Sequence, residues 1–218
     1  MKNVISLILL VCVQLVGCST ANEIPSTEPA PAPEGAKVIL PLPDGTMDAL
    51  SDSIVSVSFG EGDFYLSDSG KAMLKIKVYT YDKYDLVDIS MLQVGDILKT
   101  CDGDVAIDSM HTNEFGTILI NEGLDNGGLN LSTNNSGIYF LQGYNDMKFW
   151  YLAGEAELPV SDSFEFTDYA DLDKGAVVLT AEDFLNKNSE IDFRYQPQDT
   201  VIRIENGQVV AMERSYTP

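Results

Sequence analysis

The stretch "MLKIKVYTY", residues 73–81, decides the fold of this chain. Apolar side chains alternate along it with charged or aromatic ones, in the order Leu74, Lys75, Ile76, Lys77, Val78, Tyr79. Successive side chains of a β-strand point to opposite faces, so a period of two is typical of a strand with one buried face. We therefore expect a long strand here, with a hydrophobic core on the side of Leu74.

Shorter runs of the same kind follow along the chain, separated by turn residues. Candidate strands lie at 54–59, 116–121, 137–142, 147–152, 164–167 and 176–179. In "TVIRIENGQVVAMER", residues 200–214, two β-rich runs flank Asn206-Gly207, which favours a hairpin because both central residues of a type I′ turn need a positive φ. One short helix is expected near 181–187, where Thr180 can cap an acidic first turn. Many short antiparallel strands predict the all-β class, as a single compact sandwich or barrel-like domain.

The charge balance narrows the classes of partner. The chain has 13 Lys and Arg against 34 Asp and Glu, which gives a formal net charge of −21. Such a surface repels phosphate backbones, so no nucleic-acid binding is expected. The same charge keeps a protein soluble and favours cationic partners, divalent metals among them.

The N-terminus carries the clearest functional signal. Lys2 precedes an apolar run from Val4 to Val16, which is shorter than the ~20 residues of a membrane-spanning helix and has the dimensions of a secretory signal. The run ends in Leu15-Val16-Gly17-Cys18, which resembles the lipobox of bacterial lipoproteins. This resemblance implies that residues 1–17 are a lipoprotein signal peptide and that Cys18 is acylated, with chains such as palmitate. Two acyl chains anchor a protein stably, so we expect it at the cell membrane, lipid-anchored on the extracytoplasmic face.

The composition changes after the lipobox. Residues 18–36 comprise the lipidated cysteine and a Pro-rich segment that is too poor in apolar residues to pack, and this segment is expected to be a tether. Residues 37–218 are expected to form an all-β extracytoplasmic domain, as one domain or as two small β lobes. From Tyr81 to the closing "ENGQVVAMERSYTP", the chain is similar to uncharacterised lipoproteins of anaerobic Gram-positive bacteria. That resemblance implies a location and a domain extent, and no activity.

The stretch "KTCDGDVAIDSMHTNE", residues 99–114, raises the question of a reactive site, since it holds Cys101 and the only histidine, His111. Asp102-Gly103 is a two-residue hairpin signal, which places the cysteine at the turn and separates it from the histidine by ~24 Å of strand. A catalytic dyad needs ~2.6–3.2 Å between the two side chains, so no catalytic residue is predicted here. The other two cysteines belong to the signal peptide and the lipid anchor, so the mature chain can form no internal disulfide.

No cofactor is expected, and one metal is left open. One histidine and one free cysteine are too few for a usual zinc site. Calcium is the open alternative, at the carboxylates of Asp168, Asp171 and Asp173. The segment "DLDKGAVVLTAE", residues 171–182, has acidic residues at positions of an EF-hand loop, but Ala176 stands where the sharp turn needs Gly, so it is not an EF-hand. The other interpretation is an acidic surface turn that leads into the helix.

Aromatic residues gather in "YNDMKFWYLAG", residues 144–154. Four of them are candidates for ligand binding: Tyr144, Phe149, Trp150 and Tyr151. Flat exposed rings beside polar groups suit the face of a sugar ring. On a strand, Phe149 and Tyr151 would share one face and Trp150 would lie on the other. The alternative is that these rings belong to the core or cover a sheet.

These expectations converge on a lipid-anchored extracytoplasmic β-domain that acts as a binding or structural module of the cell envelope. Two alternatives stay open: a cell-surface binder of carbohydrate or peptide, and a hydrolase that uses carboxylates. No residue set points to an enzyme, because paired catalytic carboxylates cannot be singled out among 34 acidic residues. The expected partners are the membrane, through the N-terminal lipid, and a glycan or protein of the envelope.

Overall fold

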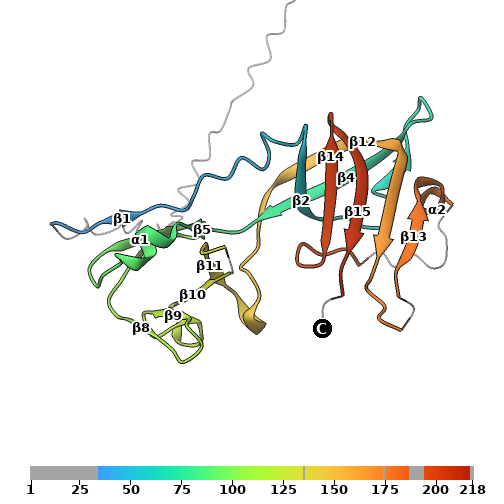
Figure 1. The fold of residues 1–218 in the computed structure, drawn as a ribbon. Helices are drawn as coiled ribbons and strands as arrows, with labels where there is room; N and C mark the ends of the chain where they lie inside the picture. The colour runs from blue at the N-terminus through green and yellow to red at the C-terminus, as the bar shows by residue number, and fades with distance from the viewer. Residues whose placement is uncertain (1–33, 135, 174, 187–193, 217–218) are drawn as a thin grey trace, which may run out of the picture. The chain divides into compact units, whose positions relative to one another are not determined.

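The computed structural model describes residues 34–134, 136–173, 175–186 and 194–216 (Figure 1). The expected signal peptide, Cys18 and the tether up to residue 33 lie outside the described residues. Strands dominate the described chain and its helices are short, which confirms the all-β class. None of the described helices is long and apolar enough to cross a membrane.

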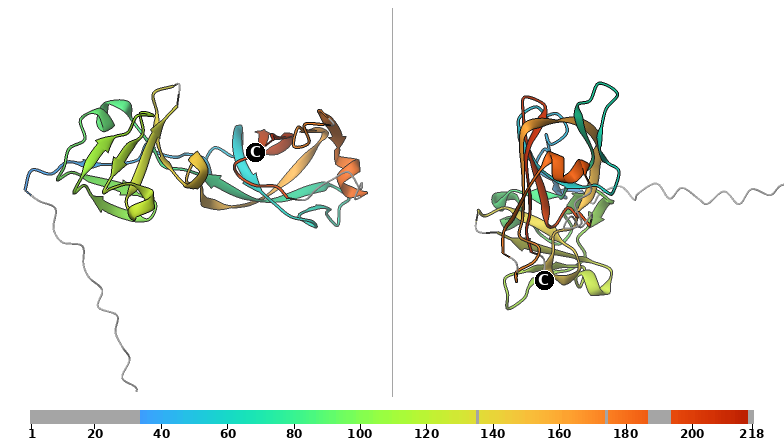
Figure 2. Two further views of the ribbon diagram at one scale, coloured as in Figure 1. Left: turned by 90° about the horizontal axis from the view of Figure 1, so that it is seen from below. Right: turned by 90° about the vertical axis from the view of Figure 1, so that its right-hand side faces the viewer.

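Seven strands of the described chain form the larger sheet, which we call the barrel sheet. They are β2 (Ser53–Ser58), β3 (Phe64–Leu66), β4 (Ala72–Thr80), β12 (Tyr151–Asp168), β13 (Val177–Thr180), β14 (Thr200–Glu205) and β15 (Gln208–Arg214). The long strand β12 pairs with β4 through its first half and with β15 through its second half. Because β14 and β2 connect β15 back to β4, the strands β12-β15-β14-β2-β4 close into a ring (Figures 1 and 2).

Strand β4 lies in the ring as its sequence pattern predicts. Leu74, Ile76 and Val78 are at most 3% exposed, whereas the lysines between them face solvent. The core that they join is rich in aromatic rings: Phe59, Phe64, Phe164, Phe166, Phe184 and Tyr195. Full burial of one such side chain stabilises a fold by about 1.5–3 kcal/mol, so this core is a main source of the stability of the barrel sheet.

Two local predictions near the C-terminus are confirmed. Asn206 and Gly207 adopt φ of 49° and 71° and join β14 to β15 in a tight hairpin. The helix α2 (Ala181–Leu185) follows Thr180, whose backbone N–H and hydroxyl both donate to the Asp183 carboxylate, at 2.7 and 2.8 Å. This contact satisfies a donor at the helix N-terminus and places negative charge beside the positive end of the helix.

A second group of strands builds a separate core. In the described chain, one open sheet has the strand order β5-β11-β10-β9-β8. A second, smaller sheet has the order β1-β6-β7. The strands are β1 (Val38–Ile39), β5 (Lys83–Tyr84), β6 (Ile97–Thr100), β7 (Gly103–Ala106), β8 (Met110–Thr112), β9 (Ile118–Ile120), β10 (Leu129–Thr133) and β11 (Tyr139–Gln142). Their core is aliphatic except for Tyr84: Ile39, Ile89, Leu92, Leu98, Ile107, Ile120, Leu131 and Leu141.

The open sheet belongs to a segment that is inserted between two paired strands of the ring. The chain leaves the barrel sheet at the end of β4 and re-enters it at the start of β12. Thr80 and Tyr151, which flank this insertion, are direct partners in the β4–β12 pairing. The ring and the insertion have no core residue in common, although both belong to one unit of the described chain.

Three details differ from the sequence-based expectations. The short helix α1 (Leu86–Ser90), which Asp85 caps by accepting from the Val87 N–H at 2.7 Å, lies where no helix is expected. The hairpin of β6 and β7 turns at Cys101-Asp102, because Thr100 pairs with Gly103. Of the expected strand at 147–152 only the last two residues lie in a strand, at the start of β12, and before it Lys148 forms an isolated antiparallel bridge with Gln142.

The expectation of antiparallel strands also needs one qualification. In the described chain, β12 pairs with β15 in parallel, and so does β1 with β6, while the other ladders are antiparallel. Parallel partners need a long connection between them, and such pairings between distant segments leave no local sequence pattern.

Candidate functional site

An apolar hollow of about 300 Å³ opens beside the loop between β11 and β12. We call it the aromatic hollow. Its described lining residues are Leu124, Gly143, Tyr144, Met147, Lys148, Phe149, Trp150 and Gln198. Most of them come from the single segment 143–150, which the sequence analysis selects for its aromatic residues.

Backbone hydrogen bonds fix the shape of this segment. The Gly143 N–H donates to the Met147 carbonyl at 2.6 Å, and the Phe149 N–H donates to the Leu141 carbonyl at 2.9 Å. Between them the 3₁₀ turn η2 (Tyr144–Asp146) includes Asn145 at a φ of 58°, a left-handed conformation that asparagine tolerates better than most residues. The loop therefore holds its side chains on a closed backbone rather than on a strand.

Three of the four aromatic candidates line the hollow. Tyr144 is 72% exposed and Phe149 is 38% exposed, so both rings present a face to solvent, and Trp150 is half-buried. Tyr151 is different, because it is the first residue of β12 and its hydroxyl donates to Asp82 at 3.2 Å. The structure thus brings Tyr144, Phe149 and Trp150 together and leaves Tyr151 out of the described lining.

The site also includes a residue that sequence reasoning missed. The Lys148 ammonium lies 4.4 Å from the ring centroid of Tyr81, 5.5 Å from that of Trp150 and 6.0 Å from that of Phe140. The rings of Tyr81 and Trp150 are packed edge to face, with 5.0 Å between their centroids. Each ring within about 6 Å attracts the cation through its quadrupole, so the three rings hold the ammonium in place. A lysine set between aromatic residues in "MKFWY" is the signal that could have pointed to it.

The hollow therefore combines two chemical properties. Its exposed rings and apolar floor suit the C–H face of a small ligand, and Gln198 and Lys148 are the long polar side chains among its described lining residues. Among the described lining residues none is Asp or Glu. This arrangement is suited to binding.

Cys101 and His111 lie in different sheets and form no dyad. Cys101 is at the turn between β6 and β7, whereas His111 pairs with Leu119 of β9 in the open sheet. Although Cys101 as a residue is exposed, partial burial of the thiol, followed by the nearby carboxylates of Asp82 and Asp102, raises its pKa to about 12. The nucleophile is the thiolate, so the raised pKa lowers the reactive fraction of this thiol at neutral pH.

The buried Asp82 carboxylate forms hydrogen bonds at that turn. Asp82 is 3% exposed, and its carboxylate accepts from the Cys101 backbone N–H at 2.7 Å and from the Tyr151 hydroxyl at 3.2 Å. Burial and this carboxylate raise the pKa of Tyr151. Asp82 thus ties the β6–β7 turn to the first residue of β12.

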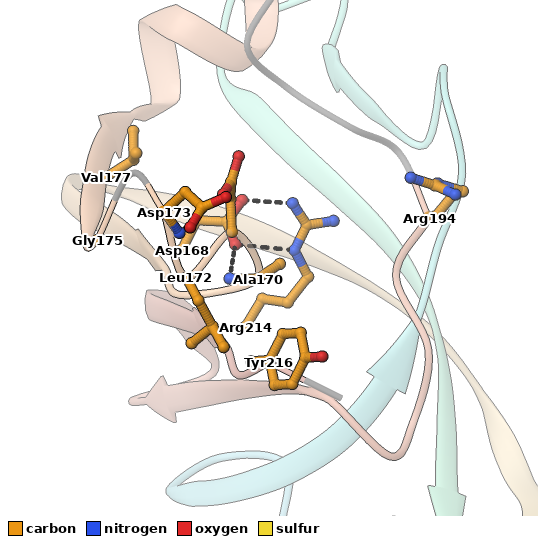
Figure 3. A pocket seen from close by; sticks show the side chains of 10 residues that line it. Asp168, Ala170, Leu172, Asp173, Gly175, Val177, Arg194, Arg214 and Tyr216 are labelled. Atoms are coloured by element: carbon orange, nitrogen blue, oxygen red, sulfur yellow. Dashed lines mark hydrogen bonds and ion pairs between the residues drawn. The ribbon is translucent and has the colours of Figure 1, made fainter. Parts of the chain in front are cut away.

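The three aspartates weighed for calcium line a second hollow, of about 560 Å³ (Figure 3). Asp168 accepts from the Nε of Arg214 at 3.0 Å and from the Ala170 N–H at 2.9 Å, and its other oxygen is ion-paired with the Nη2 of Arg214. Arg214 is buried, and its guanidinium lies over the ring of Tyr195 at 4.8 Å. The carboxylate of Asp168 is therefore already engaged on both oxygens.

The neighbouring carboxylates do not complete a cation cage. Asp171 accepts from the Asp173 N–H at 3.1 Å, which is the geometry of a turn. Within the described ranges no group of three or more His, Cys, Asp or Glu could hold a metal ion. The arrangement gives no support to the calcium alternative and fits a structural ion pair at the end of β12.

Comparisons with protein-family models, with curated proteins and with solved structures give no significant match to this chain.

Proposed function

We propose that this protein is a lipid-anchored binding module of the cell envelope and that it binds a glycan at the aromatic hollow. The observation that carries the proposal is the exposure of Tyr144 and Phe149 on the wall of that hollow. Large exposed rings are costly to leave in water, and a contiguous group of them marks a contact site. Cys18 is the proposed anchor, which would hold the domain on the extracytoplasmic face of the membrane.

A glycan fits the hollow better than an extended peptide does. The volume of about 300 Å³ is at the lower end of the range of small-molecule sites. A sugar ring has one apolar C–H face that can stack on an aromatic ring, and hydroxyls that can reach an amide such as that of Gln198. Extended peptides more often add a strand to a sheet edge, and the loop that forms this hollow offers none.

The hydrolase alternative is the less favoured one. Glycoside hydrolysis uses two carboxyl groups that flank the scissile bond, at most about 9.5 Å apart. No described residue that lines the aromatic hollow carries a carboxylate. We therefore expect binding without turnover.

Intrinsic fluorescence tests the proposal directly, because Trp150 is the only tryptophan in the chain. A panel of soluble oligosaccharides, neutral and acidic, is titrated into the protein while Trp150 emission and the heat of binding are followed. Loss of a stacking ring from a small site should weaken binding about tenfold in the variant Tyr144→Ala. The matched control is Tyr169→Ala, which removes an exposed tyrosine outside the described lining. Equal affinities for both variants, or no binding by any member of the panel, would contradict the proposal.

Membrane fractionation tests the anchor. The variant Cys18→Ala should move the protein from the membrane fraction to the soluble fraction, because one short apolar run cannot replace two acyl chains. Cys101→Ala is the matched control, since it also removes a cysteine and should stay with the membrane. A membrane-bound Cys18→Ala protein would rule out the lipid anchor.

A further inference from the structure

We infer that the glycan bound at the aromatic hollow is acidic, and that Lys148 binds its carboxylate. This inference rests on the proposed function and names the class of ligand within it. It starts from the charges around the hollow: Lys148 is the only charged residue among the described residues that line it. This lining residue is a cation, whereas the chain as a whole has 13 basic against 34 acidic residues.

The ammonium of Lys148 is held but not neutralised. Its contacts are with the rings of Tyr81, Phe140 and Trp150, and within the described chain it forms no ion pair. In contrast, Lys99 pairs with Asp104 at 2.8 Å. Rings attract a cation without accepting its N–H donors as an anion does, so an ammonium with three donors keeps hydrogen-bonding capacity for a ligand.

The rings also prepare Lys148 for this role. A free lysine side chain loses considerable rotamer entropy when it is fixed in one contact. Here three rings already restrict the side chain, so less entropy is lost when a ligand pairs with the ammonium. A carboxylate on a sugar that stacks against the wall of the hollow can accept a charge-assisted hydrogen bond from it, which is about twice as strong as a neutral one.

The acidity of the whole chain does not oppose this contact at short range. Exposed charges farther away than the Debye length, about 8 Å at physiological salt, are largely screened. A carboxylate in direct contact with Lys148 is not screened in this way. The long-range repulsion slows the approach of an anion, whereas the short-range pair determines whether it stays.

The experiment compares acidic sugars with neutral forms of the same sugars. The probes are trigalacturonate, a hyaluronan tetrasaccharide and sialyllactose, each paired with its carboxyl-reduced form, and affinities are measured by calorimetry. We expect at least one acidic probe to bind about tenfold more tightly than its reduced form, which is the effect of one hydrogen bond to a charged group. Equal affinities for acidic and reduced forms would overturn the inference and leave the proposed function intact. A complete lack of glycan binding would instead refute the proposed function.

Two lysine variants assign the preference to a residue. Lys148→Met keeps an aliphatic side chain between the rings and removes the charge, so the preference for the acidic probe should disappear. Lys83→Met is the control, because the Lys83 ammonium lies 5.0 Å from the centroid of the same Tyr81 ring but is not among the residues that line the hollow. The control should keep the preference, and both variants should unfold at the temperature of the parent protein. A preference that survives in Lys148→Met contradicts the inference.

Discussion

Aromatic rings have opposite positions in the two parts of this protein. In the core of the barrel sheet they are inside: Phe59, Phe64, Phe164, Phe166, Phe184 and Tyr195 are each at most 7% exposed. They pack against one another; the rings of Phe59 and Tyr195, for example, are stacked with 4.1 Å between their centroids. In the insertion the core is aliphatic except for Tyr84, and although Phe140 is also buried, Tyr144 and Phe149 lie at the surface.

Under the proposed function, this difference places the residues that stabilise the fold apart from those that bind the glycan. Buried rings contribute to the free energy of folding and are not accessible to a ligand. Exposed rings contribute little to folding, and in the insertion the buried aliphatic side chains together with Tyr84 have the structural role. Substitution of a buried ring should therefore lower the free energy of unfolding, whereas substitution of an exposed ring should lower the affinity for the glycan. This difference tests the comparison.

Phe166→Ala should have the largest effect on stability. Phe166 has no exposed surface, and the centroid of its ring lies 5.4 Å from that of Phe184 and 5.8 Å from that of Tyr195. Truncation of such a ring leaves a cavity and should lower the free energy of unfolding by about 3–5 kcal/mol, measured by urea denaturation. Phe149→Ala is the counterpart and should cost less than about 1 kcal/mol while it weakens glycan binding. A similar loss of stability in both variants would break the comparison.

Gly128→Ala should have an intermediate effect, confined to the open sheet. A Cβ at Gly128 would lie 2.0 Å from the Ile120 carbonyl oxygen and 2.3 Å from that of Asn121, so the backbones of β9 and β10 would have to separate. Overpacking of this kind costs about 1–3 kcal/mol. Hydrogen exchange should show loss of protection in β9 and β10 while the amides of β4 stay protected.

The control for this variant is Gly45→Ala. An added Cβ at Gly45 meets no atom within 4 Å, so its free energy of unfolding should match that of the parent protein. Equal loss of protection in β4 and β10 of Gly128→Ala would mean that the ring and the insertion unfold as one, despite their separate cores.

The smallest effect concerns Cys101, at the turn that Asp82 ties to β12. The pKa of its thiol is raised from an ordinary value of 9.0 to about 12 by partial burial and nearby carboxylates. Between these two values the unfolded chain loses the proton and the folded chain keeps it, so the folded state binds more protons and stability falls as the pH rises from 9 to 12. Below pH 9 the thiol is neutral in both states and has no such effect.

Cys101→Ser isolates this contribution, because serine does not ionise in this range and keeps the backbone N–H that donates to Asp82. The variant should lose less stability than the parent between pH 9 and 11, measured by urea denaturation at each pH. Native Cys101 should also react with iodoacetamide at pH 8 at least tenfold more slowly than the urea-unfolded chain. Rapid labelling of the native protein would show that the thiol is not shielded.

Sequence patterns predict the local features of this fold well. The alternation in β4 predicts both its strand and its buried face, and Asn206-Gly207 predicts a hairpin, because each depends on residues next to one another. The closure of the ring depends on β12 pairing with both β4 and β15, which are far apart in the chain. No short window of sequence contains that information.

The candidate site follows the same division. Three aromatic residues of the hollow could be found because they are neighbours in one segment, whereas Tyr151 lies outside the described lining because β12 begins at that residue. The cage around Lys148 could not be found, since Tyr81 reaches it from the other end of the insertion. The β6–β7 turn lies one residue before the predicted position, and there the Cys101 N–H donates to Asp82, which is distant in the chain.

The place where the insertion joins the ring has a consequence for how such proteins can diversify. The chain departs and returns at Thr80 and Tyr151, which are already partners in the β4–β12 ladder. Inserted domains are tolerated where the two ends of the host are close together, because the host then needs no rearrangement to accept them. The ring can accordingly serve as a constant frame, and under the proposed function exchange of the segment between these two residues would change what the domain binds.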